Sequence, residues 1–270
     1  MDSAEVGKKP QVAEVSSSFQ FPNTQEAIAG LPDAKTREVF GETLTSGELA
    51  GNIEILKELI AKKPDQNKLI DIQEKFAAVV FEDLAWRYLQ GELGSDKIVL
   101  SPQQTFTLYQ IAYPRKRVKK HNFGFTRSIE GVYLPDGLVI SVNGETAFIT
   151  GVCEYSLTTR PFGVGLDHKG QQAARNRSIE INKLLKYNSE KLGHFMNLLN
   201  PNLSFKIAAR YDLSYYVCPE RDVGKMQTQA GVTDVNVLNL PIKRRDFNDI
   251  IADMVNDVIG EDESPPLDKI

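Results

Sequence analysis

Two acidic residues, Asp136 and Glu154, lie on opposite arms of one predicted β-hairpin. The hairpin runs from Ile129 to Ser156, and both arms are rich in apolar β-forming residues. Asn143 and Gly144 between the arms match the two central positions of a type I′ turn, which require positive φ. Because this turn sets the register of the arms, we expect the two carboxylates to face each other.

Paired carboxylates of this kind suit a hard divalent cation such as Mg²⁺ or Mn²⁺. A bound cation neutralises a phosphate and lowers the pKa of a coordinated water, as phosphodiester hydrolysis requires. Glu154 and Ser156 are two residues apart on one strand, so their side chains should leave it by the same face. Cys153 and Tyr155 should leave by the other face.

The pairs Pro135-Asp136 and Glu154-x-Ser156 resemble the signature of the PD-(D/E)xK nuclease superfamily, which has the restriction-endonuclease-like fold. That signature is Pro-Asp on one strand and an acid-x-Lys on the next. Members often carry an acid on a preceding helix, and Glu82 in the segment VVFEDLAWRYL resembles it. Ser156 stands where the family usually has lysine.

The resemblance implies an α/β protein with a restriction-endonuclease-like central mixed β-sheet, flanked by helices and preceded by an N-terminal helical extension. It also implies a hydrolase, a Mg²⁺-dependent (or Mn²⁺-dependent) endonuclease acting on DNA. The implied metal ligands are Asp136, Glu154, Glu82 and the backbone carbonyl of Tyr155, and the first two would be catalytic.

The missing lysine leaves two alternatives open. In the family this cation orients the attacking water, and losing one such electrostatic group typically costs ~2.7–4 kcal/mol of transition-state stabilisation. Some branches place the lysine on the following helix, and Lys169 is then the candidate, ahead of Arg160, Arg175 and Lys183. The alternative is a catalytically inactive relative that binds nucleic acid or a protein partner.

A basic run precedes the hairpin, and it predicts phosphate binding. Its five cations are Arg115, Lys116, Arg117, Lys119 and Lys120. Contacts to phosphates would make DNA binding depend steeply on salt, whereas the alternative is a solvated loop. Gln171 and Gln172, at the start of a later predicted helix, are further candidates for phosphate contact.

The periodicity of apolar residues predicts the surrounding elements. Thr45-Ser46-Gly47-Glu48 has the form of a capping box, Pro64 ends the helix that follows, and a longer helix is expected over residues 66–90. Strands are expected in the segments after residues 204 and 235, and a last helix from Phe247 to Ile259. The predicted organisation is a flexible tail (1–23), a helical extension (24–65), an α/β core (66–260) and an acidic tail (261–270).

Composition narrows the class of protein. The chain has 270 residues, a net charge of −4 and two cysteines, too few for a disulfide framework. It contains no apolar run of the ~18 residues that a membrane span needs and no secretion signal. We therefore expect a cytoplasmic protein without membrane contact, and a homodimer or larger complex remains open.

Overall fold

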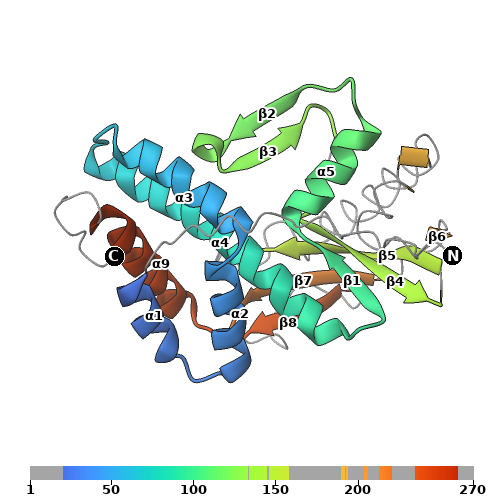
Figure 1. Ribbon diagram of the computed structural model, residues 1–270, viewed down its shortest axis with the longest axis horizontal. Helices are drawn as coiled ribbons and strands as arrows, with labels where there is room; N and C mark the ends of the chain where they lie inside the picture. Colours follow the sequence, from blue (N-terminus) through green and yellow to red (C-terminus); the bar gives the residue numbers. More distant parts are fainter. Residues whose placement is uncertain are drawn as a thin grey trace, which may run out of the picture.

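The computed structural model describes residues 21–132, 134–144, 146–157, 190–191, 193, 204–205, 213–220 and 235–260. In these ranges the protein is mixed α/β, as predicted, with one large mixed sheet and a separate two-stranded ribbon (Figure 1). None of the helices in these ranges has both the length and the apolar character needed to cross a membrane.

The main sheet has the order β1-β4-β5-β7-β8, and a short β6 pairs with β5. β1 pairs antiparallel with β4, and β4 with β5, whereas β5, β7 and β8 run parallel. The strands span Lys97–Leu100 (β1), Gly137–Asn143 (β4), Thr146–Tyr155 (β5), Ser204–Phe205 (β6), Leu213–Pro219 (β7) and Val235–Leu240 (β8). The predicted hairpin therefore supplies the sheet with two neighbouring inner strands.

The hairpin β4–β5 differs from the prediction at both ends. Asn143 pairs with Thr146, so Asn143 is the last paired residue of β4 rather than a central residue of the turn. Gly144, at φ 58°, takes the left-handed conformation that glycine tolerates. The first arm begins at Gly137, directly after Asp136, and Ile129 belongs to a different sheet.

Helices cover both faces of the main sheet. One face packs on α5, Pro102–Ala112, through Leu138, Ile140 and Val152. The other face packs through Val139, Cys153 and Tyr155 on a larger helical layer. That layer contains α1 (Pro22–Ala29), α2 (Ala34–Leu44), α3 (Gly47–Ile60), α4 (Gln66–Leu93) and α9 (Arg244–Gly260).

The helix ends follow local signals, with two corrections. The Ser46 side chain caps α3 by accepting from the Leu49 backbone N–H, so the predicted box between Thr45 and Glu48 is wrong. α4 continues through Gly91 to Leu93 and ends at Gly94, whose φ is 78°. The helix survives Gly91 because packing outweighs the cost of roughly 1 kcal/mol for an interior glycine.

The basic run leads into a separate two-stranded ribbon and not, as was expected, directly into the strand beside Asp136. Arg115, Lys116 and Arg117 precede the ribbon, and Lys119 and Lys120 lie on its first strand. β2, Val118–His121, pairs antiparallel with β3, Thr126–Ile129, and the short helix η1, Asn122–Gly124, joins them. Figure 1 shows this ribbon beside α5 and apart from the main sheet. Val118 and Ile129 attach it to the α5 cluster.

Candidate functional site

Asp136 is held at the edge of β5 by both its backbone and its side chain. Its N–H donates to the Cys153 carbonyl at 3.1 Å, and its Oδ2 accepts from the Tyr155 N–H at 2.8 Å. Gly137 allows this approach, because a Cβ at that position would lie 2.6 Å from the Tyr155 hydroxyl and 3.0 Å from the Leu100 carbonyl. The carboxylate therefore has a defined place beside the end of β5.

Three carboxylates from three elements influence one another at this point. Burial raises the pKa of Asp136 to about 6, although the Tyr155 N–H partly opposes the shift. Burial raises the pKa of Glu82 on α4 well above its usual range, and the Asp136 charge raises it further. The pKa of Glu154 is raised by burial and then by the charges of Asp136 and Glu82. Such mutual repulsion favours a bound cation or proton.

Glu82 and Asp136 open onto a cavity of about 600 Å³. Its lining comes from α3, α4, the start of α5, the ribbon and the segment before β4. Glu154 is outside this lining, yet the charges of Asp136 and Glu82 raise its pKa. All three side chains are half-buried rather than sealed from solvent, so the cavity gives solutes access to the edge of the carboxylate group.

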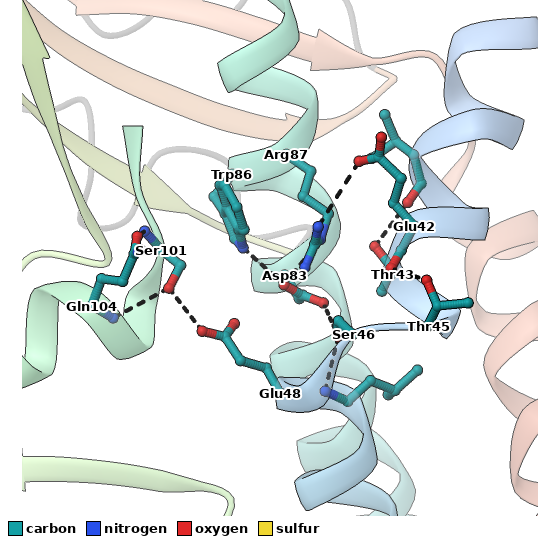
Figure 2. Close-up of polar contacts among 12 residues, drawn as sticks. Glu42, Thr43, Thr45, Ser46, Glu48, Asp83, Trp86, Arg87, Ser101 and Gln104 are labelled. Atoms are coloured by element: carbon teal, nitrogen blue, oxygen red, sulfur yellow. Dashed lines mark hydrogen bonds and ion pairs between the residues drawn. The ribbon is translucent and has the colours of Figure 1, made fainter. Parts of the chain in front are cut away.

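A second acidic pair, Glu48 and Asp83, lines the same cavity. Figure 2 shows the polar contacts of both side chains. Glu48 accepts from the Ser101 hydroxyl at 2.8 Å, whereas Asp83 accepts from Ser46 at 2.9 Å and from the Trp86 indole N–H at 2.8 Å. Burial raises the pKa of Glu48 to about 7, and the Asp83 charge contributes to the rise. This pair joins α3 to α4 and α5 through polar contacts.

The ribbon adds positive charge to the cavity wall. Arg127 lines the cavity together with Gly124, Phe125 and Ser128, and its guanidinium lies 5.9 Å from the centre of the Phe106 ring. On the ribbon, Lys120 is the cross-strand partner of Arg127. The cavity wall therefore carries a cation from the ribbon as well as the carboxylates.

The side chains at this site offer a limited set of ligands for a divalent metal. In the described ranges, no three side chains of His, Cys, Asp or Glu converge closely enough to hold one ion. Mg²⁺, however, is usually held by one or two carboxylates and completes its octahedron with water and substrate phosphate. Asp136 with either Glu82 or Glu154 supplies such a set, with the Tyr155 carbonyl at the end of the same strand.

Several predicted residues lie outside the described part of the chain. Lys169, Gln171 and Gln172 are among them, as are the weaker candidates Arg160, Arg175 and Lys183. Within the described part, Arg115, Lys116, Arg117, Lys119 and Lys120 are all exposed. Lys119 forms an ion pair with Glu130 at 2.7 Å. Ser156 donates its backbone N–H to the Val217 carbonyl, which continues the parallel pairing of β5 and β7.

Sequence reasoning did not identify Glu48, Asp83 and Arg127 as cavity residues. The local pattern around Glu48 predicts only a helix cap, whereas its carboxylate accepts a hydrogen bond from Ser101, 53 residues further along the chain. Arg127 carries no local motif. Only a correct prediction of the β2–β3 register would have placed Arg127 opposite Lys120 and so indicated a pair of cations at this position.

Comparisons with protein-family models, with curated proteins and with solved structures found no match for this chain.

Proposed function

We propose that this protein is a Mg²⁺-dependent or Mn²⁺-dependent endonuclease of the restriction-endonuclease-like fold that hydrolyses DNA phosphodiester bonds. The observation that carries the proposal is the electrostatic coupling of Asp136, Glu154 and Glu82 beside a cavity large enough for a nucleotide. Three neighbouring carboxylates destabilise a folded protein unless a cation or protons compensate for their charge.

In this proposal Asp136 and Glu154 are the catalytic metal ligands together with the Tyr155 carbonyl, and Glu82 is an outer ligand that would reach the ion through a coordinated water. A bound divalent ion would supply Lewis-acid activation of water and charge neutralisation on the phosphate. The Tyr155 N–H orients the Asp136 carboxylate. Arg115, Lys116, Arg117, Lys119 and Lys120, with Gln171 and Gln172, would contact DNA phosphates, and Lys169 would supply the cation that Ser156 cannot.

The second candidate function is a catalytically inactive module that binds nucleic acid or a protein partner. Ser156 favours it, because an uncharged hydroxyl in place of the family lysine removes the group that stabilises charge on the phosphate. Fold alone cannot separate these functions. A homodimer or larger complex is compatible with either one.

Calorimetric titration with Mg²⁺ or Mn²⁺ tests the metal site. We expect Asp136→Asn and Glu154→Gln each to weaken metal binding about tenfold or more, while Glu48→Gln, a cavity acid outside the trio, should bind like wild type. Affinity should also rise as pH increases through about 6, since Asp136 must lose its proton to bind metal. Equal, negligible binding by all four proteins would overturn the metal site.

Cleavage assays on supercoiled, linear and single-stranded DNA then separate the two functions. Metal-dependent cleavage that disappears in Asp136→Asn supports the endonuclease. Lys169→Ala should lower the cleavage rate about 100-fold or more while leaving metal binding intact, because only transition-state stabilisation is lost. Metal binding without cleavage of any DNA form would instead support the inactive module.

A further inference from the structure

We propose that the β2–β3 ribbon binds an unpaired DNA strand, with a base stacked on Phe123 and a phosphate held between Lys120 and Arg127. The inference rests on the proposed action on DNA and specifies the form of its substrate. The ribbon here means residues 118–129, from the start of β2 to the end of β3. Four observations support this assignment.

Phe123 is exposed at the tip of the ribbon. With 37% of its surface accessible, it is the exposed large hydrophobic residue of the described ranges. Its chain neighbours Gly124 and Phe125 line the cavity, so Phe123 adjoins the cavity lining along the chain. A solvent-exposed aromatic ring beside cations is the arrangement by which proteins stack unpaired bases without reading their sequence.

The backbone holds Phe123 in an unfavourable conformation. Asn122, Phe123 and Gly124 all have positive φ, at 49°, 58° and 106°. Asparagine and glycine tolerate the left-handed region, but a bulky aromatic residue rarely adopts it. Phe123 therefore combines an exposed ring with a strained backbone conformation. Backbone strain of this kind is frequent at ligand-binding sites.

Lys120 and Arg127 stand directly opposite each other across the ribbon. Like charges in this position destabilise a strand pair. Neither has a carboxylate partner among the described residues, and the contact recorded for Arg127 is with the Phe106 ring. An anion between the two cations would remove their repulsion.

Alternation along the strands gives the direction in which this cation pair points. Lys120 leaves β2 on the same face as Val118, and Arg127 leaves β3 on the same face as Ile129. Val118 and Ile129 pack against the α5 cluster, and Arg127 lines the cavity that also contains Asp136. Because Arg127 lines this cavity, a phosphate bound to the pair would lie beside the same cavity as the Asp136 carboxylate.

A single strand fits this geometry better than a duplex. Stacking on Phe123 requires a base whose face is free, whereas bases inside a duplex are already stacked. The cavity of about 600 Å³ also matches one nucleotide rather than a double helix. The structure therefore assigns the unpaired strand as the bound form.

Fluorescence anisotropy in EDTA, which prevents cleavage, tests the assignment with a labelled single strand of about 12 nucleotides and its blunt duplex. We expect wild type to bind the single strand more tightly at equal salt. Phe123→Ala should weaken single-strand binding about 5- to 150-fold, while Phe123→Tyr, which keeps an aromatic face, should retain it.

Phe123→Gly separates binding from folding. Glycine relieves the positive φ, so this variant should melt at a higher temperature than Phe123→Ala and yet bind the single strand equally weakly. Lys120→Gln and Arg127→Gln should each weaken binding and reduce the slope of log affinity against log salt by about one unit. Lys68→Gln, an exposed lysine in the first turn of α4 away from the cavity lining, is the matched control.

The outcomes separate this inference from the nuclease proposal. Equal affinity for single strand and duplex, or wild-type binding by Phe123→Ala, overturns the ribbon assignment even if the protein cleaves DNA. If the protein does not cleave DNA but its single-strand binding depends on Phe123, the ribbon assignment stands and only the proposed endonuclease activity is overturned. Tighter binding of the same sequence as RNA would overturn the choice of DNA.

Discussion

At the residue scale, the cavity contains two kinds of carboxylate. Asp136 is oriented by one backbone N–H, and its charge is coupled to those of Glu82 and Glu154. Glu48 and Asp83 instead carry several side-chain hydrogen bonds that tie helices together. We infer that the first group is suited to ligand binding and the second to structural support, because polar partners already occupy the second.

Glu48→Gln should change how stability depends on pH. The folded-state pKa of Glu48, about 7, is above the usual 4.5. Its contribution to stability is therefore complete below pH 4.5 and is lost as pH rises through 7. Glutamine imitates the protonated acid, so the variant should exceed wild type at pH 8 by about 1–2 kcal/mol, a value reduced for solvent screening, and match it at pH 4.5.

Urea unfolding at pH 4.5, 6 and 8 measures this difference. Glu54→Gln, exposed on the same helix, serves as the control for removing one carboxylate from this helix. A Glu48→Gln difference that is constant across the three pH values would contradict the assignment.

At the element scale, the segment Pro135–Gly137 positions the candidate site. The Asp136 side chain and backbone both bond to β5, and Gly137 starts β4 with no room for a Cβ. The glycine requirement here is steric, since Gly137 is not among the residues with positive φ. A side chain at this position would push the Asp136 segment away from β5.

Gly137→Ala should therefore destabilise the protein by about 2 kcal/mol, the cost typical of an overpacked site. It should also weaken Mn²⁺ binding, because Asp136 moves with its neighbour. Gly41→Ala on α2 is the matched control, since nothing lies within 4 Å of a Cβ there, and it should stabilise by roughly 0.5–1 kcal/mol. Thermal unfolding and calorimetry check both variants, and a Gly137→Ala protein as stable as wild type would refute the steric argument.

At the scale of the whole molecule, the two ends of the described chain close against each other. Asp257 on α9 accepts from the backbone N–H groups of Asn23 and Thr24 at 3.3 and 3.0 Å, and from their side chains at 2.6 and 2.7 Å. These N–H groups begin α1, where a negative charge also favours the helix dipole. The contact attaches the N-terminal helices to the layer that covers the sheet.

Asp257→Ala should cost about 2–4 kcal/mol of stability, since it leaves the buried N–H and hydroxyl of Thr24 without an acceptor. Asp249→Ala, on the same helix, should change stability by less than about 0.5 kcal/mol, because no hydrogen bond is recorded for its side chain in the described ranges. Urea unfolding monitored by far-UV circular dichroism measures both. Similar losses in the two variants would show that the Asp257 contact is not specific.

The sequence by itself determined the elements whose signals are local. Alternation of apolar residues predicted the pairing of β4 with β5, and periodicity predicted α4 and α9. The register that sets the hairpin acids differs from the predicted one, since the turn is shifted and a bulge lies between Val139 and Ile140. The exact turn residues and the end of α4 were missed because packing shifts boundaries by a few residues.

Only the tertiary structure decided which distant segments meet. Local sequence does not indicate these long-range contacts. They are the pairing of the separate ribbon, the Glu48–Ser101 hydrogen bond, the position of Arg127 in the cavity wall and the packing of α1 on α9. Backbone propensity acts over a few residues, whereas these contacts arise when apolar faces of different elements are buried together and bring polar side chains within bonding distance.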